Sequence, residues 1–241
     1  MKVALIVVLI FALVVPLVAR LQAVELVEAN FTPLPSSLPI IYIKSDGSIE
    51  PDSAPLRHSG DIYYLTRKLF DYTIRIQKDN IILDGVGRTI HASSVDTEGL
   101  MIPIGWRPAI HLDKTSNVTI RNFKLQSCYS AIYVQESKNI TITNSTMVNN
   151  CYGIVMLGST NTTIAKNHIT NGSTGIILYS SSNNTLFDNN ISSNIEGVNF
   201  YSASNNNNCI KNNNLTANTG HAIFFNGGVV NHTIFQNTIS Y

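Results

Sequence analysis

Apolar and polar positions recur in a fixed order between residues 117 and 241, which indicates a repeat protein. Six segments led by Asn begin at intervals of 22, 22, 22, 24 and 24 residues. Their first residues are Asn117, Asn139, Asn161, Asn183, Asn207 and Asn231. If this Asn is counted as position zero, positions three and eight are apolar in every copy. Each copy therefore predicts the same short elements in the same order.

A second apolar segment follows a small residue in the first five copies. Its apolar residues lie two apart, as in Ile132 and Val134 or Ile176 and Leu178, which is the period of a strand. One copy has too few inward side chains for a core of its own, so successive copies must stack about 4.8 Å apart. The pattern predicts an all-β fold, a single-stranded parallel β-helix with coils of 22 to 24 residues. Its predicted hand is right-handed, the general preference of parallel connections.

The recurring polar residues predict turns joined by side-chain ladders. The leading Asn, and the Asn found at position six in later copies, suit turns with left-handed backbone angles. Their amides can also bond to the equivalent amides of the coils above and below. Ser137, Ser159 and Ser181 predict a shorter ladder of the same kind.

These repeats resemble those of the NosD-type parallel β-helix family, also described as carbohydrate-binding and sugar-hydrolysis repeats. The stretches 41–49 and 79–90 resemble the amino-terminal entry of archaeal surface proteins of that type, so the resemblance covers about four fifths of the chain. It implies the fold, but it implies no single activity, because this scaffold hosts lyases, hydrolases, adhesins and proteins without known chemistry.

The amino-terminal part divides into three segments before the repeats. Residues 1–23 carry Lys2, a long apolar run and small residues, which predicts a secretory signal peptide. An uncleaved membrane anchor formed by residues 3–19 is the alternative, and both place the body outside the cell or on its surface. Residues 24–39 are predicted to be a linker, 40–79 to be capping strands, and 80–241 to be the β-helix repeats.

Composition and charge limit the partners. Charged residues make up 13% of the chain and the formal net charge is +1, without a basic stripe, so we expect no nucleic acid partner. A polysaccharide or a surface protein is the expected partner, and membrane contact is expected only through the amino-terminal segment. No polar cap precedes Tyr241, so a partner or further chain is expected to cover the carboxyl end.

A 15-residue excess between the coils that begin at Asn80 and Asn117 predicts an inserted loop over residues 93–108. It contains Trp106, the single tryptophan, beside Arg107. Such loops often carry function on a rigid scaffold, and this pair suits sugar stacking and carboxylate recognition. The alternative is that Trp106 packs the loop onto the coil.

Outward positions of the second strand are rich in aromatic residues. Tyr133, Tyr179, Tyr201 and Phe224 are predicted to form a platform for glycan rings or for another protein chain. The alternatives are strand propensity alone and cover by a neighbouring subunit.

The residues predict no catalytic centre, cofactor or metal site. The triplet Gly220-His221-Ala222 lacks the aspartate pair of pectin-cleaving hydrolases, and the acids of the repeats, Glu136, Asp188 and Glu196, occupy unrelated positions. The histidines are scattered, so copper handling is implied by the family resemblance alone. The expected function is an exported, non-catalytic β-helix protein that binds carbohydrate or another surface chain. The alternatives are a polysaccharide lyase or hydrolase and a NosD-like copper-handling protein.

Three cysteines leave one without a partner if any disulfide forms. Cys128 and Cys151 occupy neighbouring positions in adjacent coils and are predicted to lie close enough to pair outside the cell. Cys209 is predicted to point outward.

Overall fold

A computed structural model describes residues 39–92, 108–202, 204–227 and 231–241. The described residues belong to one compact unit, residues 38–241. The predicted signal or anchor, almost all of the linker and nearly the whole inserted loop lie outside the described residues. The described part contains strands and no helix, hence no helix long and apolar enough to cross a membrane.

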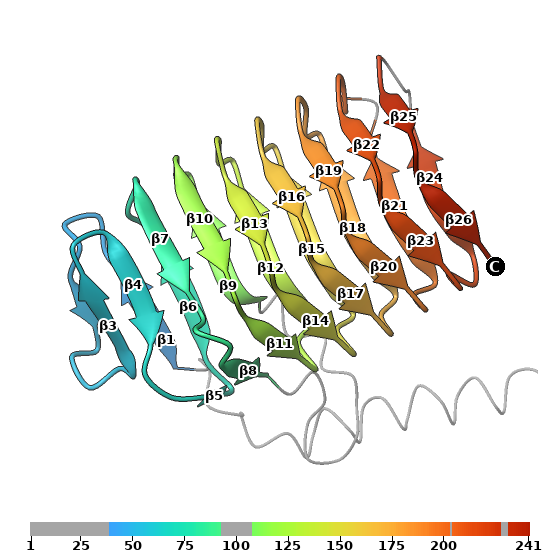
Figure 1. Ribbon diagram of the computed structural model, residues 1–241. Coiled ribbons are helices and arrows are strands. Elements are labelled where there is room, and N and C mark those ends of the chain that lie inside the picture. The colour runs from blue at the N-terminus through green and yellow to red at the C-terminus, as the bar shows by residue number, and fades with distance from the viewer. Residues whose placement is uncertain (1–38, 93–107, 203, 228–230) are drawn as a thin grey trace, which may run out of the picture. The chain divides into compact units, whose positions relative to one another are not determined.

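The strands form three parallel sheets, which we call A, B and C, and they stack coil upon coil (Figure 1). Each complete coil contributes one strand to sheet B, then one to sheet C, then one to sheet A. Seven complete coils run from β4–β6 to β22–β24 within the described residues, and β25 and β26 follow. The predicted parallel β-helix is confirmed.

Sheet A has nine strands and contains the longest ones. In spatial order they are β2 (Ile49–Glu50), β1 (Ile40–Ile43), β6 (Thr73–Ile76), β9 (Pro108–Asp113), β12 (Ser130–Gln135), β15 (Tyr152–Leu157), β18 (Thr174–Tyr179), β21 (Glu196–Tyr201) and β24 (His221–Asn226).

Sheets B and C are built from shorter strands. Sheet B contains β3 (Leu56–Ser59), β4 (Ile62–Leu65), β7 (Ile81–Asp84), β10 (Val118–Arg121), β13 (Thr141–Thr143), β16 (Thr163–Ala165), β19 (Thr185–Phe187), β22 (Cys209–Lys211) and β25 (Thr233–Phe235). Sheet C contains β5 (Leu69–Phe70), β8 (Thr89–His91), β11 (Lys124–Gln126), β14 (Thr146–Val148), β17 (His168–Thr170), β20 (Asn190–Ser192), β23 (Asn214–Thr216) and β26 (Thr238–Ser240).

Strands before residue 80 already join these ladders. β6 pairs in parallel with β9, β4 with β7, and β5 with β8. At the amino-terminal end, β2 pairs antiparallel with β1, and β3 pairs antiparallel with β4. Parallel stacking therefore begins well before the Asn-led repeats, and two antiparallel strands lie on the edges of sheets A and B.

Equivalent side chains lie directly over one another along the core. Ile120 pairs with Ile142, and Ile142 with Ile164, so the position-three residues form one buried apolar column. Position eight does the same through Leu125 and Met147. Burial of these columns supplies the main driving force for stacking.

The asparagines at position zero and at position six have different structural roles. The six leading Asn residues have φ between 53° and 59°, so they form the left-handed corners that were predicted. The prediction of left-handed angles was wrong at position six, where the residue before it turns the chain, as Asp188 (φ 55°) does before Asn189. Asn189 thereby points inward and is buried.

Position six forms a buried amide ladder along the axis. Asn189 Nδ2 donates to the backbone oxygen of Ile164 (2.8 Å) and to Asn213 Oδ1 (2.9 Å). Its Oδ1 accepts from the backbone N–H of Asn167 (3.0 Å). Serine hydroxyls supply hydrogen-bond acceptors at another corner of the coil. The Ser137 hydroxyl accepts from the backbone N–H of Thr115, and the Ser159 hydroxyl accepts from that of Ser137. The ladders supply partners for turn backbone that the core excludes from water.

Candidate ligand-binding groove

The outward side chains of sheet A form two neighbouring columns. From β9 to β24, each strand of sheet A contributes two outward side chains, two residues apart. Because neighbouring strands pair in register, each of these side chains lies beside its equivalent on the next strand, and the two sets form two columns. One column contains Arg75, His111, Tyr133, Val155, Ile177, Asn199 and Phe224. The other contains Asp113, Gln135, Leu157, Tyr179, Tyr201 and Asn226.

The middle of these columns is hollowed into a groove of about 560 Å³. We call it the tyrosine groove, and its lining residues are Tyr133, Tyr152, Val155, Leu157, Ile177, Tyr179 and Tyr201. Val155 and Ile177 lie in its apolar floor, while Tyr179 and Tyr201 are 41% and 47% exposed. Concave apolar surfaces with a few polar groups are typical ligand sites.

The aromatic rings of the groove are ordered by contacts with each other. The Tyr179 and Tyr201 rings stack with centroids 5.5 Å apart and planes 22° from parallel. Tyr152 meets Tyr129 edge to face at 5.4 Å. The stacked pair Tyr179 and Tyr201 therefore forms a partly exposed aromatic surface at one side of the groove.

The structure places the predicted binding residues unequally. Tyr133, Tyr179 and Tyr201 line the groove together. Phe224 is half-buried and stacks instead on His221, with ring centroids 4.7 Å apart. Trp106 and Arg107 lie outside the described residues.

Sequence reasoning missed Tyr152 and Arg75. Tyr152 precedes the small residue of its coil, so the period-two pattern gave it no outward role. Arg75 lies before the recognised repeats, although Ile74 and Ile76 flank it as Ile110 and Leu112 flank His111. That alternation was the signal that could have found it.

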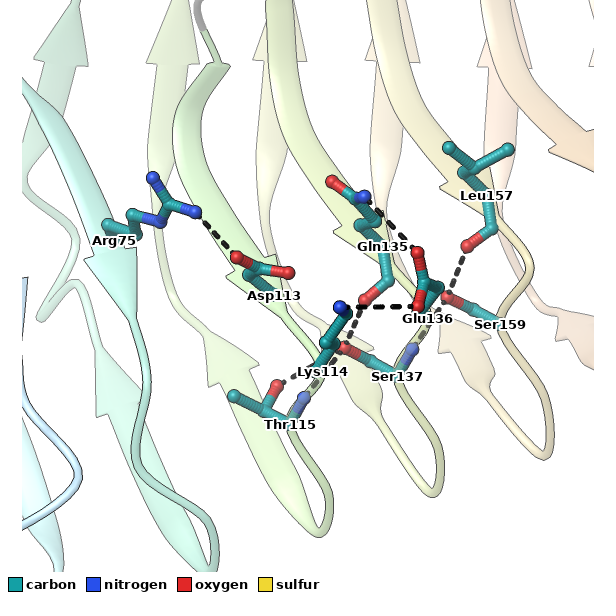
Figure 2. Close-up of polar contacts among 9 residues, drawn as sticks. All are labelled: Arg75, Asp113, Lys114, Thr115, Gln135, Glu136, Ser137, Leu157 and Ser159. Carbon is teal, nitrogen blue, oxygen red and sulfur yellow. Dashed lines mark hydrogen bonds and ion pairs between the residues drawn. The ribbon is translucent and has the colours of Figure 1, made fainter.

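A polar cluster continues the outward columns of sheet A on the amino-terminal side of the groove. Figure 2 shows its two ion pairs, Arg75 with Asp113 and Lys114 with Glu136. Arg75 Nη2 donates to Asp113 Oδ2 at 2.5 Å. His111 lies between Arg75 and Tyr133 in its column, and its ring centroid is 5.2 Å from that of Tyr133. Lys114 Nζ pairs with Glu136 Oε2 at 3.7 Å in the following turns.

Burial and the neighbouring Arg75 charge favour the neutral form of the His111 ring. Desolvation lowers the pKa of His111 below its usual value of 6.5, and the Arg75 guanidinium lowers this pKa further. Asp113 and a hydrogen bond with Gln135 act in the opposite direction but do not reverse the shift. A neutral imidazole has one donor and one acceptor nitrogen.

The carboxyl-terminal end of the groove carries one acid. Glu196 Oε2 accepts from Asn199 Nδ2 at 2.5 Å. Asp113 and Glu196 are separated by four strand steps, from β9 to β21, which is about 19 Å at 4.8 Å per step. Glycoside hydrolases hold their two carboxyl groups about 5 to 9.5 Å apart. These two acids therefore cannot serve as such a pair.

Cys128 and Cys151, which were predicted to lie close enough to pair, form no disulfide in the structure. Cys128, Cys151 and Cys209 are free thiols. Cys128 is fully buried because position eleven points into the core, and its Sγ donates to the backbone oxygen of Gln126 at 3.3 Å. Cys151, one position later, is only half-buried. The two side chains therefore have different environments although their backbones lie in adjacent coils.

The stacked coils and their lateral groove define a parallel β-helix protein. The model of one family, periplasmic copper-binding protein (NosD), matches residues 66–222. The chain belongs to this family. Its description is periplasmic, in agreement with the predicted export. No curated protein matches the chain significantly.

Several solved structures are similar at low identity. They include tailspike protein 2 of bacteriophage CBA120 (15% identity, TM-score 0.44, covering 73% of this chain and 34% of that one). DFA-IIIase of Arthrobacter chlorophenolicus A6 has 15% identity and a TM-score of 0.44 over 61% and 38% of the two chains. The periplasmic alginate epimerase AlgG has 15% identity and a TM-score of 0.47 over 81% and 62%. The chain thus spans about a third of the length of the first two.

The described residues do not fit the copper site that the family description implies. Copper sites gather His, Met or Cys side chains. Over the described ranges, no group of three or more His, Cys, Asp or Glu residues could hold a metal ion. Met147, Met156 and Cys128 are fully buried in the apolar core. Met101 lies outside those ranges.

Proposed function

We propose that this chain is an exported β-helix protein that binds carbohydrate along the tyrosine groove and leaves it chemically unchanged. The single observation that carries the proposal is the stacked pair Tyr179 and Tyr201 beside the apolar floor of the groove. Sugar rings have apolar faces that pack on aromatic rings, while their hydroxyls reach polar groups at the edge. The groove offers both kinds of surface.

The charges near the groove support binding without cleavage. Asp113 is engaged by Arg75, and Glu136 by Lys114. Asp113 and Glu196 are too far apart to act as acid and base on one glycosidic bond. A hydrolase or lyase activity would therefore need residues other than these.

The family's periplasmic description supports a location beyond the cytoplasmic membrane. We propose display at the cell surface, where polysaccharides are the abundant extended ligands. Retention by residues 3–19 and cleavage after the leader remain the two alternatives. Amino-terminal sequencing of the protein from its native host distinguishes them, because a cleaved chain begins near residue 24.

A glycan array followed by product analysis tests the function. Purified residues 38–241, the unit that contains all the stacked coils, are expected to retain at least one class of oligosaccharide. The bound oligosaccharide is then incubated with the protein and examined for new reducing or unsaturated ends. Binding without such ends agrees with the proposal. New ends would establish the lyase or hydrolase alternative, and an array without retained glycans would overturn carbohydrate binding.

A further inference from the structure

Two polar atoms at the amino-terminal end of the tyrosine groove lack a partner. Arg75 Nε and His111 Nε2 are buried and accept or donate no hydrogen bond within the described residues. Arg75 and His111 occupy directly paired positions on β6 and β9, so they lie one strand spacing apart, about 4.8 Å. Buried polar atoms without partners are costly, and such atoms in native structures often mark the place of a bound group.

The chemistry of the two atoms limits what can satisfy both. Arg75 Nε–H is a donor under all conditions. Burial favours the neutral form of the His111 ring, and in the tautomer with the proton on Nδ1 the unpartnered Nε2 accepts. A hydroxyl group accepts one hydrogen bond and donates another, so a single hydroxyl can serve a donor and an acceptor that lie side by side. A carboxylate can only accept.

The charges of the groove strands also disfavour an acidic ligand. On strands β6, β9, β12, β15, β18 and β21, the charged residues are Arg75 (+1), Asp113 (−1) and Glu196 (−1). Their sum is −1. Because Arg75 already pairs with Asp113, no free positive charge remains on these strands to hold an anion, and Glu196 repels one.

We propose that Arg75 and His111 form a hydroxyl-binding subsite that extends the tyrosine groove and makes it select neutral glycans over acidic ones. This inference rests on the proposed carbohydrate binding. The ligand runs along the solenoid axis, from Arg75 on β6 to Tyr201 on β21. That path covers five strand steps, about 24 Å. One sugar ring packs on Tyr179 and Tyr201, and a hydroxyl further along the chain reaches Arg75 and His111.

Calorimetric titration with matched hexasaccharides tests the selectivity. The neutral set contains cello-, laminari-, manno- and maltohexaose, and the acidic set contains hexagalacturonate and hexamannuronate. The best neutral ligand is expected to bind at least tenfold more tightly than either acidic one. Equal or tighter binding of an acidic hexasaccharide would overturn the inference while leaving carbohydrate binding intact. If no member of either set binds, both the inference and the proposed function fall.

The variant His111→Phe tests the subsite itself. It keeps an aromatic ring against Tyr133 and removes the acceptor, so neutral-ligand affinity is expected to fall about five- to tenfold, the value of one hydrogen bond. The matched control is His168→Phe on sheet C, an exposed position outside the groove, which should leave affinity unchanged. An unchanged affinity in His111→Phe would overturn the subsite.

A measurement on the unaltered chain covers the case in which His111→Phe does not fold. In ¹⁵N-histidine-labelled protein, the Nε2 resonance of His111 is expected to move when the neutral hexasaccharide is added, while that of His168 stays fixed. A His111 resonance that does not move at saturation would contradict the proposed contact.

Discussion

Tyr179 and Tyr201 occupy directly paired positions on β18 and β21, and their rings stack at 5.5 Å. The two rings contact each other and together form an aromatic surface at the edge of the groove. Because both are more than 40% exposed, their removal should alter binding far more than folding.

The double change Tyr179→Ser and Tyr201→Ser is expected to lower glycan affinity about 10- to 100-fold, since two aromatic contacts are lost. The free energy of unfolding should change by about 1 kcal/mol or less. Phe70→Ser is the matched control, because Phe70 is 53% exposed on sheet C. Calorimetric titration and urea unfolding measure the two quantities, and unchanged affinity would remove the tyrosine groove as the binding surface.

Asn189→Ala should destabilise the solenoid by about 2 to 4 kcal/mol, because it leaves buried backbone groups of Ile164 and Asn167 without partners. The control is Asn161→Gly. Asn161 is an exposed corner with φ 54°, which glycine adopts freely, so its effect should stay within about 0.5 kcal/mol. Urea unfolding monitored by circular dichroism provides the comparison. Similar losses in both variants would contradict the separate tasks of the two positions.

The thiols should differ in their reaction with iodoacetamide. Burial raises the pKa of Cys128 to about 12, so the nucleophilic thiolate is scarce at neutral pH and the sulfur is also inaccessible. Cys209 is half-buried and should be alkylated in the folded protein, whereas Cys128 should react only after unfolding. Peptide mass spectrometry identifies the alkylated residues. Rapid alkylation of Cys128, or a Cys128–Cys151 disulfide, would contradict its position in the core.

Stability should decrease as the pH falls below about 6.5, the ordinary pKa of histidine. The pKa of His111 is lowered in the folded chain, first by burial and then by Arg75. Between the ordinary pKa and the lowered pKa of the folded chain, the unfolded chain binds a proton that the folded chain does not. The free energy of unfolding therefore decreases as the pH falls through this range. Asp113, Tyr133 and Gln135 are the other groups that face this ring from β9 and β12.

Urea unfolding between about pH 8 and about pH 5 checks this dependence. Burial also lowers the pKa of His232, so the unaltered chain carries two such groups. His111→Phe should show a smaller loss of stability on acidification than the unaltered chain. A pH dependence that is identical in the two proteins would mean that His111 does not contribute.

The repeat pattern predicted the fold because, in stacked coils, residues at equivalent positions of successive repeats lie directly over one another. The columns of Ile120 and Leu125 follow directly from counting, and so does the shared face of Tyr133, Tyr179 and Tyr201. The hollow of the groove did not follow from counting, since its depth depends on the sizes of Val155 and Ile177 relative to the tyrosines around them.

Other features depended on geometry that a one-dimensional pattern does not contain. Cys128 points inward and Cys151 lies half-buried. In each coil a corner between the preceding strand, β11 or β14, and the cysteine sets this direction. The pairing of Arg75 with Asp113 joins residues 38 positions apart, across the inserted loop that interrupts the period. A search for alternating apolar residues before residue 80 would have placed Arg75 on the correct face.

The fixed corners also constrain how such a chain can change in length over evolution. A single inserted residue within a strand would move the later side chains of that strand off their columns, whereas a duplicated block of 22 residues would add one more coil and leave the others in place. The binding surface can therefore grow only in increments of about 4.8 Å. Such a scaffold behaves as a molecular ruler, and relatives with one coil more or fewer should differ by one step in the length of ligand that they fit best.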